Sequence, residues 1–184
     1  MKAGRIYEII RKTVQKSGYD DKVGDTFANL FRYMNDKRWY GACHATCSVL
    51  SVCLTELGYS PQLCIGEAIA DTLLFDHSWI VMDKKVVDLA IALPLAGDDS
   101  FGPVILDTNV QTMKKYTLRY GIKAQGLDTQ AQHVMDMAFG DYMSQYPDEK
   151  EGLWGVVKKV FPGKVCIDEL KEKYHNVNRE YIVY

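Results

Sequence analysis

Three residues, Cys43, His77 and Asp88, have the side chains of a thiol-based catalytic triad and occur in that order along the chain. A cysteine nucleophile needs a lowered pKa, a base that takes its proton and a group that orients the base. Histidine can act as the base, and aspartate can hold the imidazole in the correct orientation. The three residues therefore predict nucleophilic attack by Cys43 on a carbonyl carbon.

The surroundings of Cys43 favour a reactive thiolate. Gly41 precedes it, and apolar residues at steps of four and three predict a helix that begins at Cys43 and ends before Gly58. Cys43 then lies at the helix N-terminus, where the macrodipole and the free N–H groups stabilise a thiolate. The Cys43 amide would be one oxyanion donor, and Trp39 or Tyr40 could supply the second.

The relative position of His77 and Asp88 depends on a predicted β-hairpin. Two runs rich in strand-forming residues flank the dipeptide Asp83-Lys84. If this dipeptide is the loop, Asp88 lies opposite Trp79 and on the same face as His77, about 7–8 Å away. A loop longer by one residue would move Asp88 to the opposite face. Lys84 would adopt a positive φ, where glycine is preferred, and Trp79 is expected to pack beside the pair.

The remaining pattern predicts an α+β fold with helices at both ends of the chain. In the N-terminal half we expect a helix that stops at Gly18, a second helix capped by Asp25 and followed by a turn at 35–38, a strand over 63–69, and loops over 70–76 and 92–103. From about Gln111 the chain is expected to be mostly helical, with one helix around Leu153–Val160 and a late strand over 180–184. One helical segment of this region contains Val134, Met135, Ala138 and Phe139.

Composition excludes several other classes of protein. A chain of 184 residues fits a single domain spanning 1–184, and the net charge of −2 gives no electrostatic reason to expect a nucleic-acid or membrane partner. No apolar run is long enough to span a bilayer. Five cysteines cannot form a complete disulfide framework, so a reducing, cytoplasmic location is expected.

Several short motifs also carry a family resemblance. They are Gly41-Ala42-Cys43-His44-Ala45-Thr46, Leu57-Gly58, Gly66-Glu67, His77-Ser78-Trp79 and Val87-Asp88. This pattern resembles the transglutaminase-like superfamily, including its bacterial peptide-maturation proteases, and is more distantly similar to arylamine N-acetyltransferases. The resemblance covers about residues 39–91 and leaves the C-terminal half without an assigned role. It implies a papain-like fold, in which a central helix packs on an antiparallel sheet between flanking N- and C-terminal helices.

The expected reaction is acyl transfer through Cys43, with a peptide or protein as substrate and no cofactor. Hydrolysis by a peptidase or amidase is the first choice, because the chain is small and has no recognisable coenzyme-binding feature. An amine acceptor would instead make the protein a transglutaminase or an N-acyltransferase. A non-catalytic protein that binds a peptide or partner on the same fold is the competing class, since fold alone does not determine function.

Metal binding and thiol redox chemistry are less favoured alternatives for the same segment. Cys43 and Cys47 could share an ion, but a zinc site needs three or four ligands and His44 is expected to point away from their face. A disulfide between Cys43 and Cys47 would span one helical turn, which is poor geometry for the bond. We therefore expect no metal ion here, and core packing for Cys47.

Overall fold

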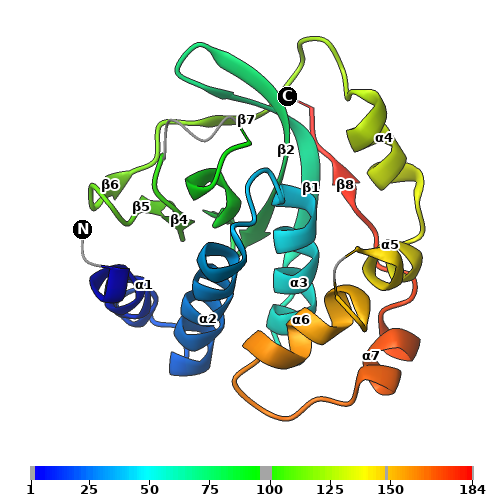
Figure 1. Cartoon of the computed structure of the whole chain (residues 1–184). Coiled ribbons are helices and arrows are strands. Elements are labelled where there is room, and N and C mark those ends of the chain that lie inside the picture. The colour runs from blue at the N-terminus through cyan, green and yellow to red at the C-terminus, as the bar shows by residue number, and fades with distance from the viewer. Residues whose placement is uncertain (1–2, 96–100, 148, 184) are drawn as a thin grey trace.

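The computed structural model describes residues 3–95, 101–147 and 149–183 and has an α+β fold (Figure 1). The helices are α1 (Ala3–Lys16), α2 (Asp21–Lys37), α3 (Cys43–Glu56), the 3-10 turn η1 (Ala90–Ala92), α4 (Thr129–Asp136), α5 (Phe139–Gln145), α6 (Gly152–Val160) and α7 (Ile167–Lys173). The strands are β1 (Gln62–Ala70), β2 (Leu73–Met82), β3 (Lys85–Val87), β4 (Val104–Ile105), β5 (Thr108–Asn109), β6 (Lys114–Lys115), β7 (Arg119–Ile122) and β8 (Glu180–Tyr181). Within these ranges, no helix combines the length and the apolar character that crossing a membrane requires.

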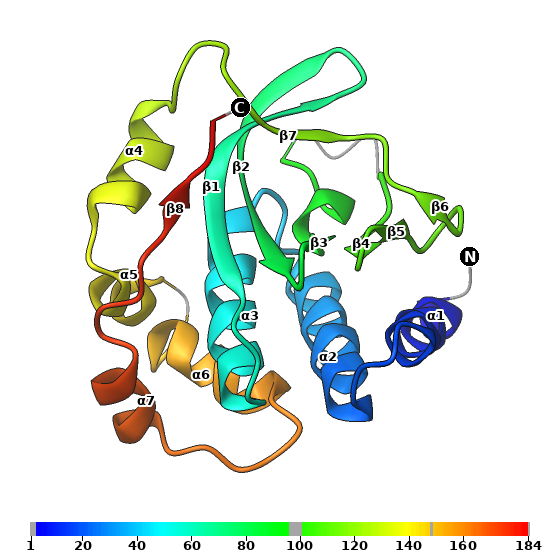
Figure 2. The same cartoon turned by 180° about the vertical axis from the view of Figure 1, so that it is seen from behind.

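The main sheet is built around the long β1–β2 hairpin. Its strand order is β3-β2-β1-β7, and β8 pairs in parallel with β1 next to β7. Figure 2 shows β8 running beside β1, so the C-terminal segment adds an edge strand to the sheet on the side of β1 opposite β2. A small second sheet has the order β4-β5-β6. The late strand predicted over 180–184 is confirmed at β8, and Tyr184 lies outside the described residues.

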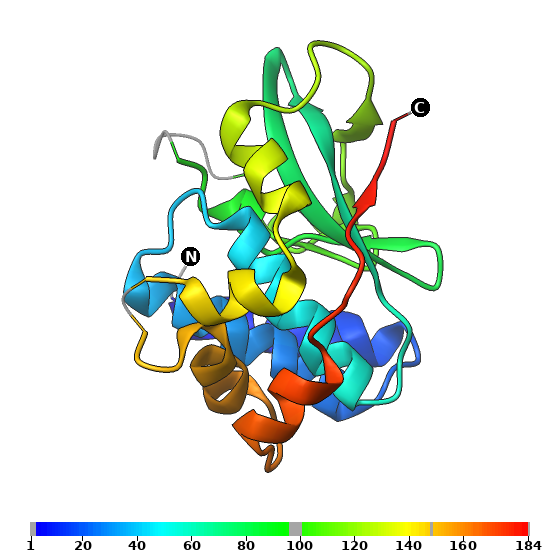
Figure 3. The ribbon, with the colours of Figure 1, turned by 90° about the vertical axis from the view of Figure 1, so that its right-hand side faces the viewer.

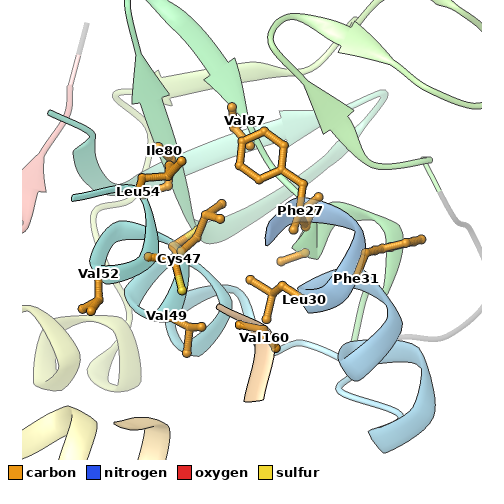
Figure 4. Packing of buried hydrophobic residues seen from close by; sticks show 14 of the residues in the cluster. Phe27, Leu30, Phe31, Cys47, Val49, Val52, Leu54, Ile80, Val87 and Val160 are labelled. Atoms are coloured by element: carbon orange, nitrogen blue, oxygen red, sulfur yellow. The ribbon is translucent and has the colours of Figure 1, made fainter. Parts of the chain in front are cut away.

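Helix α3 packs on one face of the main sheet and is buried on nearly all sides. Eleven of its residues are buried, so it does not present the single apolar face that the sequence pattern predicts. Figure 3 shows α3 between the sheet and the other helices, and Figure 4 shows how side chains of α2 and α3 fill the core between the helices and the strands. Labelled members of this core include Phe27, Leu30, Val49, Leu54 and Ile80. The central helix is therefore a rigid platform for the residues at its N-terminus.

The predicted boundaries of α2 are wrong, because the helix begins earlier and ends later than expected. Asp20 caps α2 through a hydrogen bond from the Lys22 amide, whereas Asp25 lies inside the helix and pairs with Arg11. The turn predicted over 35–38 belongs mostly to α2, which ends with a left-handed Arg38. The N-terminal stop near Gly18, the end of α3 before Gly58 and the helix over 153–160 are confirmed.

The loops also differ in part from the prediction. No loop spans 70–76, because β2 pairs with β1 as far as Ala70↔Leu73 and only a two-residue turn joins them. The loop over 92–103 includes residues 96–100, which lie outside the described residues, and Ala92 ends η1. The region after 111 is not uniformly helical, because β6 and β7 precede α4, and the segment expected to run through Phe139 divides into α4 and α5.

The predicted hairpin at Asp83-Lys84 is confirmed. Met82 pairs with Lys85, and the register continues through Ile80↔Val87. Both loop residues have positive φ, at 49° for Asp83 and 64° for Lys84, as a two-residue type I′ turn requires. This register fixes where the chain after β3 lies relative to β2.

The strain at Lys84 gives a stability prediction. We expect Lys84→Gly to raise the free energy of unfolding by about 0.5 kcal/mol or more, because glycine adopts the left-handed conformation without a Cβ clash. Lys85→Gly is the matched control: it makes the same chemical change one residue later, within β3, and should destabilise the protein. Urea denaturation of the two variants measures both effects. Equal effects of the two substitutions would contradict the role of the turn.

Candidate active site

Cys43 is the first residue of α3, and the chain before it is held in a special conformation. Gly41 has a φ of +67°, and a Cβ at this position would lie 3.0 Å from Leu95. The Gly41 amide donates to the Leu93 carbonyl at 2.9 Å. This bond joins the segment that leads into the nucleophile to the segment that follows η1. Gly41 is thus required both by backbone conformation and by close packing.

The N-terminus of α3 carries no side-chain cap. The N-cap residue, Ala42, has no side chain that can accept a hydrogen bond from the first amides of the helix. The N–H groups at Cys43 and the next residues therefore remain available to a negative charge. An anion at this position, either the thiolate or an oxyanion, interacts favourably with the helix dipole.

The structure brings His77 and Asp88 into direct contact. His77 lies on β2, is 4% exposed, and its Nε2 is 2.7 Å from Oδ2 of Asp88. Asp88 follows β3 and is held by two backbone hydrogen bonds with Val104, each 2.8 Å long. Because Nε2 faces the carboxylate, Nδ1 is the ring nitrogen that remains for exchanging a proton with Cys43.

The Asp88 carboxylate is completely buried and accepts further hydrogen bonds. The Tyr120 hydroxyl donates to Oδ2 at 2.8 Å, and the Ile91 amide donates to Oδ1 at 3.1 Å. Tyr120 also packs its ring against Trp79, with centroids 5.0 Å apart. Burying a carboxylate is costly unless its oxygens are hydrogen-bonded, and these contacts satisfy both of them.

Sequence reasoning missed Tyr120 because the region after 111 was expected to be helical. Tyr120 lies on β7, which pairs with the end of β1 through a register shift. The short alternating run Leu118 to Ile122 is the signal that could have indicated a strand there. The tyrosine is a structural partner of Asp88 that no motif spacing identifies.

The electrostatics of the site favour a thiolate–imidazolium pair. Burial raises the pKa of Cys43, but the positive charges of His44 and His77 and their hydrogen bonds to the thiol outweigh burial and bring it well below the usual value. Burial lowers the pKa of His77, yet the charges of Asp88 and Cys43 raise it to about 10. Between these two pKa values, the proton resides on His77 and the negative charge resides on Cys43.

The dyad opens onto a cleft with a volume of about 610 Å³. Cys43 and His77 lie on its wall, and Cys43 is 8% exposed. Apolar side chains form much of the remaining wall: Leu73, Leu74, Phe75, Ile91, Pro94 and Leu95. One border is fixed by Glu67, whose carboxylate accepts the amides of Ala124 and Gln125 at 2.9 and 2.8 Å. The thiol is therefore reachable from a mainly apolar groove of a size typical for ligand sites.

The predicted substrate and oxyanion residues lie elsewhere. Trp39 packs between the rings of Tyr33 and Tyr146, and Tyr40 is exposed; among the described residues that line the cleft, neither is present. Their role as oxyanion donors stays a prediction. Trp79 is buried behind the site against Tyr120, so it shields the His77–Asp88 pair without facing the cleft.

His44 was not expected at the site but lines the same cleft. Its Nδ1 is 2.7 Å from the hydroxyl of Ser78, the residue after His77 on β2. In the described part of the chain, no group of three or more His, Cys, Asp or Glu side chains could hold a metal ion. His44 therefore lies on the cleft wall beside the Cys43 thiol.

The other cysteines differ from Cys43 in environment. Cys47 is buried one turn into α3, its thiol donates to the Ser78 carbonyl at 3.2 Å, and burial raises its pKa. Burial likewise raises the pKa of Cys53 and that of Cys64, whereas Cys166 is exposed. Core packing of Cys47 is thus confirmed. Cys43 is the thiol that combines access with a lowered pKa.

No model of a known protein family, no curated protein and no solved structure matches this chain.

The lowered pKa of Cys43 predicts alkylation at acidic pH. In a Cys166→Ser background, iodoacetamide should modify Cys43 at pH 6 about 10-fold or more faster than a small free thiol, whose thiolate fraction falls about tenfold per pH unit below about 8.5. Peptide mass spectrometry after timed labelling measures the rate at Cys43. The variant His77→Gln is the control and should bring the rate down. A wild-type rate that follows the free thiol over the whole pH range would refute the ion pair.

The buried Tyr120–Asp88 bond predicts a stability effect. Tyr120→Phe removes a hydroxyl that donates to a buried carboxylate, and we expect a loss of about 1.5–3 kcal/mol in the free energy of unfolding. Tyr181→Phe, at a residue 46% exposed, is the matched control and should change stability by less than about 0.5 kcal/mol. Urea denaturation measures both variants, and an unchanged midpoint in Tyr120→Phe would contradict the assigned contact.

Proposed function

We propose that this protein is a cysteine-dependent acyl-transfer enzyme, most simply a peptidase or amidase. The observation that carries the proposal is that Cys43 and His77 share the wall of one cleft, and that His77 Nε2 lies 2.7 Å from Oδ2 of Asp88, which is buried behind it. A thiol, a base and an orienting carboxylate in this order are the parts that nucleophilic catalysis requires. The pKa directions of Cys43 and His77 support the same assignment.

The arrangement of elements supports a papain-like or transglutaminase-like interpretation. The thiol begins a central helix, α3, the imidazole lies on the sheet strand β2, and the carboxylate follows the neighbouring strand β3. Helices from both ends of the chain pack around α3, since α2 and α6 contribute to the same core. These features agree with the resemblance seen over residues 39–91, while the fold alone leaves the reaction undetermined.

Formation of the acyl-enzyme would use the resting thiolate. The Cys43 sulfur attacks the carbonyl carbon, the S–C bond forms, and the carbonyl electron pair moves onto oxygen. The Cys43 amide would donate to this oxyanion, and the lack of a side-chain cap on α3 supports this role. The tetrahedral species then collapses as His77 passes its Nδ1 proton to the leaving amine and the C–N bond breaks.

Release of the acyl group would use the now neutral His77. Its Nδ1 takes a proton from water, the hydroxide oxygen attacks the thioester carbon, and the S–C bond breaks to give a carboxylic acid and regenerate the thiolate–imidazolium pair. Asp88 keeps the imidazole oriented throughout through the bond to Nε2. An amine in place of water would give a new amide by the same sequence of steps.

The cleft supports a substrate with an apolar side chain next to the scissile bond. Leu73 and Leu74 lie on one wall, and Ile91, Pro94 and Leu95 lie on the segment after Asp88. An apolar group bound there would be removed from water close to the thiol, which supplies binding energy for positioning the carbonyl. A peptide or a protein segment with an aliphatic or aromatic residue fits this lining.

Labelling with electrophilic peptides tests the proposed function. In the Cys166→Ser background, a peptidyl vinyl sulfone with an apolar side chain should label Cys43, and Cys43→Ala should lose the label completely. His77→Gln should slow labelling at pH 6 by about 100-fold or more, as expected for removal of an acid–base partner. Circular dichroism checks that both variants fold. Labelling that persists in Cys43→Ala, or that does not depend on His77, would refute the proposal.

The acceptor can be determined with a peptide thioester as acyl donor. If hydrolysis is the main reaction, free acid should be the principal product even when hydroxylamine or a primary amine is added at millimolar concentration. Mass spectrometry of the products measures the ratio of acid to amide or hydroxamate. A predominant amide product would assign the protein to transglutaminase or N-acyltransferase chemistry, and binding of the peptide without turnover would favour the non-catalytic alternative.

A further inference from the structure

A second imidazole lies beside the nucleophile. His44 is the second residue of α3, is half-buried and lines the cleft together with Cys43 and His77. Its Nδ1 is 2.7 Å from Oγ of Ser78, which is 2% exposed and follows His77 on β2. Adjacent residues of one strand therefore provide both the base and a hydroxyl that holds the second imidazole.

The Ser78 contact determines which nitrogen of His44 remains available. A hydroxyl that donates to Nδ1 places the ring proton of a neutral imidazole on Nε2. With Nδ1 engaged by Ser78, Nε2 is the nitrogen left for the Cys43 thiol, which lines the same cleft and whose pKa His44 helps to lower. The thiol thus interacts with two imidazoles, His44 from its own helix and His77 from the sheet.

Other charged groups near His44 come from the sheet and from the segment before α4. Asp76 on β2 interacts with His44, and its carboxylate accepts the Asp128 amide at 2.7 Å. Glu67 on β1 and Asp128 also line the cleft. No described lysine or arginine lines it, so the two imidazoles are the basic groups that the described residues place around the thiol.

We propose that His44 is a second catalytic histidine, which donates from Nε2 first to the Cys43 thiolate and then to the oxyanion, with Ser78 as its positioning residue. The inference rests on the proposed function, and it supplies a second oxyanion donor beside the Cys43 amide. During attack, negative charge passes from sulfur to the carbonyl oxygen next to it, and the Nε2–H group follows that charge without giving up its proton. His77 alone transfers protons.

The test is the pH profile of Cys43 alkylation by iodoacetamide, measured in the Cys166→Ser background. His44→Leu should shift the pH of half-maximal rate upward by about one unit or more, which is a tenfold or greater loss of rate at any pH below both midpoints. His44→Gln keeps an N–H donor but replaces the ring that Ser78 holds by a flexible side chain, and it should lie between His44→Leu and the wild type. The matched control is His133→Leu, at an exposed histidine of α4, which should leave the profile unchanged.

Ser78 gives an independent arm that leaves the histidine in place. Ser78→Ala removes the hydroxyl and should shift the profile in the same direction as His44→Leu, while Ser78→Thr keeps a hydroxyl and should restore the wild-type midpoint. A merely structural role for Ser78 would change the stability of both variants but not the midpoint. These two variants also decide the question if His44→Leu does not fold.

The outcomes separate this inference from the proposed function. A low wild-type midpoint that rises in His77→Gln but is unchanged in His44→Leu and in Ser78→Ala would overturn the role of His44 alone. A wild-type midpoint equal to that of a free thiol would overturn both. For the oxyanion step, His44→Leu should lower kcat for a peptide substrate by at least tenfold at pH 9, where the thiolate is formed and His77, with a pKa of about 10, still carries its proton. KM should change little, and an unaffected kcat at this pH would remove the oxyanion role.

Discussion

The buried carboxylate of Asp88 is the constraint around which one end of the molecule is organised. A carboxylate with no exposure is stable only when hydrogen-bond donors surround it, and these come from three different segments. His77 from β2, Tyr120 from β7 and the Ile91 amide from η1 each contribute one bond. The positions of His77, of strand β7 and of η1 therefore depend on one another, because each supplies a hydrogen bond to the Asp88 carboxylate.

The nucleophile is placed by a different and equally rigid part of the fold. Cys43 begins a helix that is enclosed by the core, and Gly41 ties the preceding segment to the chain after η1. The thiol and the imidazole thus reach the cleft from two packed layers, a helix and a sheet. Positioning by regular elements limits the movement of both groups and favours a preorganised ion pair.

Local chemical signals in the sequence predicted the centre of the site, and long-range contacts account for what they missed. The start of α3 at Cys43 and the register at Asp83-Lys84 follow from helix and turn preferences that act within a few residues. Tyr120 and the Ser78–His44 contact depend on pairings between segments far apart in the chain. The same cause explains the extension of β2 back to Leu73, since pairing with β1 continues as far as Ala70↔Leu73.

The absence of a side chain able to cap α3 at Ala42 has a consequence for engineering this protein. Introduction of an aspartate at this position is a standard route to greater thermal stability and would contribute about 1 kcal/mol through the helix amides. The same carboxylate would occupy the amides beside Cys43 and would add a negative charge next to a thiolate. The unsatisfied helix end therefore marks a position where selection for heat tolerance and selection for reactivity act in opposite directions.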